Sequence, residues 1–127
     1  MKATGLMIGD WVAQKHGGLL LKVSEVRPPY IIADGEDGQF HEDTLEPIPL
    51  TKERLLANGF YCERNIGYVY DDSEYEVVVD LWNHGYRILH DRDVVMNIHC
   101  FSDVFVHELQ HALRLCDVDK EITIKED

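Results

Sequence analysis

Two histidines and a glutamate near the carboxyl end of the chain have a spacing that could perform hydrolytic chemistry. His107, Glu108 and His111 form the pattern H-E-x-x-H. On a helix this spacing places both imidazoles on one face, where they can bind zinc, and the glutamate can act as general base on a zinc-bound water. Asp117, ten residues after His107, is a candidate third ligand. Compact zinc peptidases usually bend the chain at a glycine after the motif, whereas this chain has Arg114 there.

The hydrophobic periodicity of the same segment favours a structural role. A helix over residues 103–116, capped by Ser102, is expected to gather an apolar stripe that a core would bury: Phe105, Leu109, Ala112, Leu113 and Cys116. His107, His111 and Arg114 fall on the opposite side, which we expect to face solvent. We therefore expect no catalytic residue, no metal site and no cofactor.

Composition and charge narrow the classes of function. The chain has 127 residues, of which 45% are hydrophobic, and a formal net charge of −12. Such a chain is repelled by phosphate backbones and by anionic membranes, so we expect no nucleic acid and no membrane as partner. The start of the chain lacks the apolar region of a signal peptide. Three cysteines without a C-x-x-C spacing predict no disulfide framework, and we expect a cytoplasmic protein.

The chain is expected to divide near Pro47 and Pro49, because two prolines within three residues interrupt both helices and central strands. Residues 1–46 contain short apolar runs separated by glycine-rich turns, which predicts a small SH3-like β-barrel. Residues 47–127 predict an α+β subdomain. There Thr51 caps a short helix over residues 52–58 and Gly59 ends it.

An antiparallel sheet is expected between the two helices of the second part. Its strands are predicted from runs of β-branched and aromatic residues separated by polar turns: residues 60–63, 68–70, 75–82, 86–89 and 94–98. The last helix is expected to pack on this sheet through its apolar stripe. Residues 121–124 are expected to return as a short edge strand.

Three segments resemble a family of small uncharacterised proteins of gut bacteria and of their phages and mobile elements. Ile48-Pro49-Leu50-Thr51, followed by a short helix and Gly59-Phe60, is similar to a recurrent "IPLT, helix, GF" segment. Val106-His107-Glu108-Leu109-Gln110 resembles the C-terminal signature of these proteins, and Met7-Ile8-Gly9-Asp10-Trp11-Val12 resembles their SH3-like start. The family is not known as a peptidase family, so the resemblance implies no hydrolase.

Two hypotheses of different classes follow. The first is a non-catalytic protein-interaction or accessory protein of mobile-element origin, whose partner is another protein; SH3-like barrels often bind proline-rich peptides through aromatic surfaces. The alternative is a compact zinc-dependent hydrolase with His107, His111 and Asp117 as ligands and Glu108 as base. The oligomeric state stays open.

Overall fold

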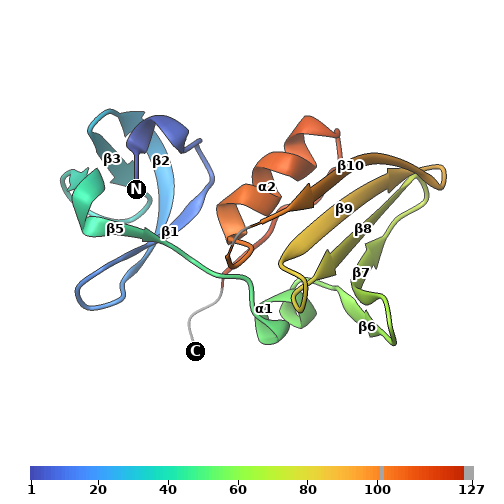
Figure 1. Cartoon of the computed structure of the whole chain (residues 1–127). Coiled ribbons are helices and arrows are strands. Elements are labelled where there is room, and N and C mark those ends of the chain that lie inside the picture. The colour runs from blue at the N-terminus through green and yellow to red at the C-terminus, as the bar shows by residue number, and fades with distance from the viewer. Residues whose placement is uncertain (101, 125–127) are drawn as a thin grey trace. The chain divides into compact units, whose positions relative to one another are not determined.

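The fold of this α+β chain was obtained as a computed structural model, which describes residues 1–100 and 102–124 (Figure 1). Two antiparallel sheets of five strands each fall in different compact units. The first unit comprises Met1–Ile48 together with Thr123 and Ile124, and the second comprises Pro49–Ile122. The division follows Ile48, two residues beyond the boundary expected from the two prolines.

The sheet of the first unit has the strand order β4-β3-β2-β1-β5. Its strands are short: β1 (Trp11–Gln14), β2 (Leu20–Arg27), β3 (Tyr30–Ala33), β4 (Phe40–His41) and β5 (Leu45–Pro47). β2 pairs with β1 through its first half and with β3 through its second half, and an irregularity between Val23 and Glu25 separates the two parts. Among the described residues β4 and β5 remain the two edges, so this sheet does not close into a barrel.

The buried face of this first sheet carries the apolar residues expected from strand alternation. Side chains from every strand but β4 join two residues of the amino-terminal turn in one core: Ala3, Leu6, Val12, Leu21, Val23, Ile31, Ala33 and Leu45. Phe40 of β4 packs against the edge of this core. The strands predicted from the sequence are therefore confirmed, whereas closure of the barrel is not shown.

The second unit opens with the helix α1 (Lys52–Ala57), whose two ends follow the sequence signals. The hydroxyl of Thr51 accepts a hydrogen bond from the backbone N–H of Arg54 at 3.2 Å. Gly59 has a φ of 86°, the left-handed conformation that glycine adopts at a helix end. The prediction of a short capped helix is confirmed.

The second sheet is an antiparallel meander with the order β10-β9-β8-β7-β6. Its strands follow one another in the chain: β6 (Tyr61–Glu63), β7 (Gly67–Asp71), β8 (Tyr75–Asp80), β9 (Gly85–His90) and β10 (Asp93–His99). Asp72 organises the turn before β8, because its carboxylate accepts hydrogen bonds from the N–H groups of Glu74 and Tyr75. The predicted meander is confirmed, although β8 ends at Asp80 rather than at Trp82.

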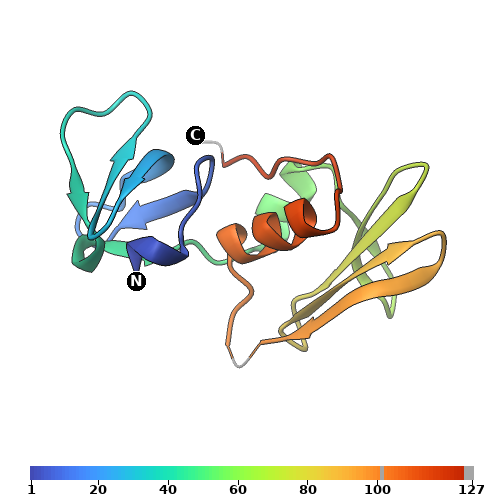
Figure 2. The same ribbon diagram turned by 90° about the horizontal axis from the view of Figure 1, so that it is seen from above.

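Both helices of this unit lie on the same face of the second sheet, and no helix among the described residues covers the other face (Figures 1 and 2). α2 (Val106–Leu115) buries Leu109, Ala112 and Leu113, as the apolar periodicity predicted. Val77 and Val79 of β8 and Ile88 of β9 are buried on the sheet. Within the described part of the chain, no helix is long and apolar enough to cross a membrane.

The start of α2 and the segment that follows the helix differ from the prediction. The helix begins at Val106 rather than at residue 103, Phe105 is the N-cap, and Ser102 is exposed. Residues 104 and 105 are extended because they pair with the segment before α1: the N–H of Leu50 donates to the carbonyl of Val104 at 2.8 Å. Residues 121–124 form no strand. At the start of α2, pairing with a distant segment thus overrides the local capping signal.

Candidate functional site

The H-E-x-x-H segment occupies the first turns of α2. The rings of His107 and His111 lie edge to face with centroids 5.7 Å apart, and the ring of Phe105 stacks against His107 at 6.2 Å. Both histidines are half-buried, and Nδ1 of His107 is fully buried. The expectation that both imidazoles face bulk solvent is therefore wrong, and Arg114 is likewise half-buried.

Glu108 is engaged at the start of the helix. Its carboxylate accepts a hydrogen bond from the backbone N–H of Phe105, the N-cap residue three positions earlier. This is the glutamate half of a capping box, and it also places a negative charge at the positive end of the helix. The thiol of Cys100 lies 4.0 Å from the same carboxylate and donates to it.

Burial is the main cause of the pKa shifts of Glu108, Cys100 and Tyr86. It raises the pKa of Glu108, against smaller lowering effects of the Phe105 N–H and of His111. Burial also raises the pKa of Cys100, and the charge of Glu108 adds to that effect. The pKa of Tyr86 on the facing strand rises to about 12, chiefly by burial. Because a thiolate is the reactive form of cysteine, this environment does not activate Cys100 as a nucleophile.

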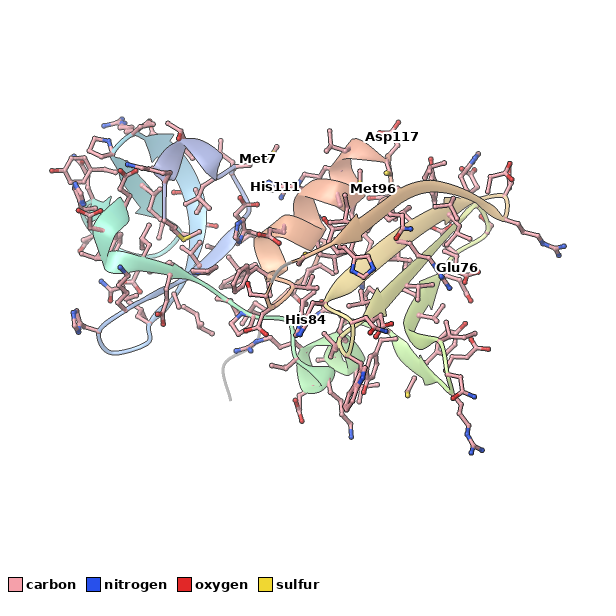
Figure 3. All side chains as sticks on the ribbon, viewed as in Figure 1. Met7, Glu76, His84, Met96, His111 and Asp117 are labelled. Carbon is pink, nitrogen blue, oxygen red and sulfur yellow. The ribbon has the colours of Figure 1, made fainter. Side chains whose placement is uncertain are left out.

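Asp117 is not brought to the two histidines. It follows the C-cap residue Cys116 in the left-handed conformation, with a φ of 60°, and is exposed. Ten residues at a helical rise of 1.5 Å separate it from His107 by about 15 Å, whereas zinc ligands lie about 2 Å from the ion. Figure 3 shows Asp117 beyond the end of α2 and apart from His111. Among the described residues, no three His, Cys, Asp or Glu side chains are grouped so that they could hold a metal ion.

The side chain of Gln110 on α2 anchors the segment that follows the helix. It is only 4% exposed. Its Oε1 accepts a hydrogen bond from the N–H of Ile122 at 2.7 Å, and its Nε2 donates to the carbonyl of Lys120 at 3.1 Å. One side chain therefore supplies the two backbone hydrogen bonds that the predicted edge strand would have taken from a sheet. A polar residue next to the buried Leu109 was the available sequence signal.

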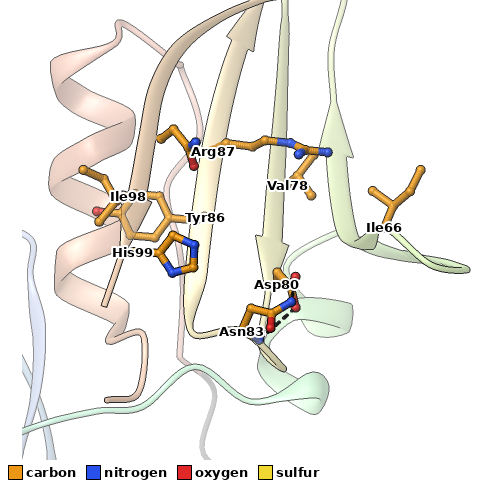
Figure 4. Close-up of a pocket in the computed structure, with 10 residues that line it drawn as sticks. Ile66, Val78, Asp80, Asn83, Tyr86, Arg87, Ile98 and His99 are labelled. Carbon is orange, nitrogen blue, oxygen red and sulfur yellow. Dashed lines mark hydrogen bonds between the residues drawn. The ribbon is translucent and has the colours of Figure 1, made fainter. Parts of the chain in front are cut away.

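The uncovered face of the second sheet contains a shallow hollow of about 360 Å³ (Figure 4). Cross-strand pairing places Val78, Arg87 and Asn97 in one row, and Asp80, Gly85 and His99 in the next. Gly85 has no side chain, which leaves room in the second row. The side-chain amide of Asn83 donates a hydrogen bond to the carboxylate of Asp80 at 2.8 Å, and the backbone N–H of Asn83 donates a second one at 3.1 Å. The side-chain bond is the main reason why the pKa of Asp80 is lowered.

Two exposed apolar residues stand beside this hollow. Trp82, in the turn between β8 and β9, is 89% exposed, and Ile66, in the turn between β6 and β7, is 40% exposed. Both line a second hollow of about 400 Å³, together with Arg64. Ile66, Trp82 and the two hollows are called the Trp82 patch below. The prediction of a strand over residues 75–82 placed Trp82 at its end, whereas the residue lies in the turn that follows β8.

The composition of the patch is of a kind that is common at protein-binding surfaces. Tryptophan and arginine are enriched at the centres of protein interfaces, and apolar side chains rimmed by polar ones are typical of such patches. The charged groups that line the hollows have both signs: Glu63 and Asp80 are acidic, and Arg64 and Arg87 are basic. No protein family, no curated protein and no solved structure matches this chain.

Proposed function

We propose that this chain is a non-catalytic accessory protein that binds another protein through the Trp82 patch. The exposure of Trp82 is the observation that carries the proposal, because a tryptophan that is 89% exposed adds little to the core of its own unit. An indole can bury roughly 150–250 Å² in a complex, which at about 25 cal/mol per Å² gives a gross gain of about 4–6 kcal/mol. That gain is of the size found at interface hot spots.

The chemistry around the patch indicates the kind of segment that binds there. The uncovered face of the sheet has an apolar centre formed by Val69 and Val78, which are buried and paired across β7 and β8. Acidic residues share this face: Asp71 and Glu76 are paired beside the centre, and Asp80 lies in the hollow. A partner segment that offers an apolar side chain to Trp82 and a positive charge to these carboxylates matches the surface.

Affinity capture from the native host with matched variants tests the proposal. Trp82→Ala removes the indole, and Leu115→Ala is the control, because Leu115 is 79% exposed on α2. We expect the wild type and Leu115→Ala to retain the same proteins, and Trp82→Ala to retain them at least about tenfold less, as for a hot-spot residue. Equal recovery with Trp82→Ala would show that the patch is not the binding surface.

The first unit fits the same proposal as an SH3-like module. Support comes from its five short antiparallel strands, from the irregularity that divides β2, and from the resemblance of residues 7–12 to the start of such modules. The origin in a mobile element rests on the family resemblance alone. A cytoplasmic location is supported by the acidic composition and by three free cysteines among the described residues.

The zinc-hydrolase alternative is left without a third ligand on the helix, since Asp117 lies beyond its far end and Glu108 bonds the helix start. The zinc content of protein purified without a histidine tag separates the two functions. About one zinc per chain that is lost in His107→Ala would favour the hydrolase and would count against the proposal made here.

A further inference from the structure

The edge strand β10 of the second sheet is open along its length. Among the described residues it pairs with β9 alone, and every residue except the half-buried Met96 is exposed. Val94 and Val95 are more than half exposed, and Ile98 is exposed as well. The opposite edge, β6, has only three residues. A long apolar edge without lysine or proline is a ready template for pairing with another strand.

The backbone groups that this edge offers can be assigned from its contacts with β9. The N–H of Cys100, directly after the strand, donates to the carbonyl of His84 at 2.8 Å, so the backbone N–H of residue 100 is directed toward the β9 side. The carbonyl oxygen of Ile98 lies 2.9 Å from the position that a Cβ on Gly85 would take, so the backbone carbonyl of residue 98 is also directed toward β9. Because bonding direction alternates along an antiparallel strand, Asn97 and His99 direct their N–H and C=O groups outward.

This alternation restricts how two copies of the strand could pair. In an antiparallel pair of identical strands, a two-fold axis at a residue with outward groups gives two reciprocal hydrogen bonds between that residue and its copy. Asn97 satisfies this condition within the regular part of β10, whereas the register shift between Val94 and Met96 disturbs the strand further back. An axis at Met96 would require Asn97 of one copy to bond Val95 of the other, and Val95 lies in that irregularity.

The side chains agree with an axis at Asn97. Met96 of one copy then lies opposite Ile98 of the other, and the pair occurs twice. Both residues share a face with the buried part of the sheet, because their partners on β9 are Ile88 and Tyr86. Cross-strand apolar pairs of this kind are the unit of sheet stabilisation. No charged residue occurs from Val94 to Ile98, so this segment places no like charges opposite each other.

We propose that the occupant of this edge is a second copy of the chain, and that two β10 strands pair antiparallel about Asn97. The two sheets then form one continuous sheet from β6 of one copy to β6 of the other. This inference concerns the backbone edge of β10 and does not rest on the proposed function, although Asn97, Ile98 and His99 also line the first hollow of the Trp82 patch.

Sedimentation velocity from micromolar to millimolar concentration tests the dimer. The wild type is expected to reach twice the mass of one chain. Asn97→Lys places like charges opposite each other at the axis and is expected to weaken association by up to about fivefold. Cys62→Lys is the matched control, because Cys62 is also an exposed edge-strand residue and the change in charge is the same. It is expected to dimerise like the wild type.

Cysteine cross-linking tests the register. In a background with Cys62→Ser and Cys100→Ser, Asn97→Cys places two thiols across the axis, where a Cα separation of about 5.5 Å suits a disulfide. The second replacement is needed because residue 94 of one copy lies opposite residue 100 of the other in this register. Val94→Cys, on the same strand and more than half exposed, is far from its own copy and is expected to form no covalent dimer. A wild type that sediments as a monomer at every concentration overturns the proposal, and so does a dimer that cross-links through Val94→Cys but not through Asn97→Cys.

Discussion

The side chain of Gln110 makes the most specific prediction about stability. Gln110→Met removes both hydrogen bonds to the chain after α2 while it keeps a side chain of similar length, and Gln110→Ala removes the bonds and the packing. Loss of two net hydrogen bonds costs about 2 kcal/mol, and the buried N–H of Ile122 adds about 1–3 kcal/mol if it stays buried.

A second route limits this cost. The segment can detach, and exposing the Ile122 side chain then costs about 1.5–3 kcal/mol. We therefore expect both variants to lose about 2–3 kcal/mol of local stability. Because 1.4 kcal/mol corresponds to tenfold, the amide of Ile122 should exchange its hydrogen roughly 30–100 times faster.

Native-state hydrogen exchange at single-residue resolution measures the effect, with urea denaturation for the global stability. Leu115→Ala is the control on the same helix, because its side chain is 79% exposed, and it should leave the Ile122 amide unchanged. The contrary result is an Ile122 amide that exchanges at the wild-type rate in Gln110→Met and faster only in Gln110→Ala. In that case packing rather than hydrogen bonding holds the segment, and the reasoning is refuted.

Three further predictions concern the second sheet and its helix. Leu109→Asp buries an unpaired charge in a fully buried position and should cost about 4 kcal/mol in urea denaturation; a loss below about 1 kcal/mol would show that the buried face of α2 is misassigned. Gly85→Ala places a Cβ about 2.9 Å from a backbone oxygen of β10, so exchange of the β10 amides should accelerate, and unchanged protection would contradict that contact. The pKa of Tyr61 is raised to about 12, chiefly by its hydrogen bond to Asp71; a spectrophotometric titration of Asp71→Asn should therefore show one tyrosine ionising at lower pH than in the wild type, and identical curves would argue against the bond.

Local signals in the sequence were sufficient for the elements whose ends depend on neighbouring residues. Thr51 and Gly59 define α1 through a side-chain cap and a left-handed residue, and both act within one turn of the helix. The strands of the meander follow from β-branched alternation and from turn residues such as Asp72, whose bonds reach only two or three positions ahead.

Features that depend on distant parts of the chain could not be predicted in this way. The start of α2 is delayed because Val104 pairs with Leu50, more than fifty positions away in the sequence. The predicted carboxyl-terminal strand is replaced by an extended segment bound to Gln110, a side chain twelve positions earlier. Periodicity predicts which face of an element is apolar, but it does not predict which backbone groups a distant segment will take.

In the candidate site, too, the local features were predicted and the long-range ones were not. Helical spacing correctly brought His107 and His111 side by side, since both belong to one helix, but a third ligand depends on where that helix ends. Glu108 has a role at the helix start that does not depend on a metal ion. A glutamate three residues after the N-cap is favoured in any helix, because it bonds the N-cap N–H and balances the helix dipole.

The same reasoning explains how a hydrolytic glutamate would differ from Glu108. In a zinc hydrolase the two histidines would hold the metal ion and the metal would bind a water molecule. The carboxylate of the general base would then have to be directed at that water. The carboxylate of Glu108 instead accepts from the Phe105 N–H and from the Cys100 thiol, in an environment that raises its pKa by burial. Its position is explained by the stability of the helix start, and the exposed Trp82 lies on the surface at which we propose that a partner binds.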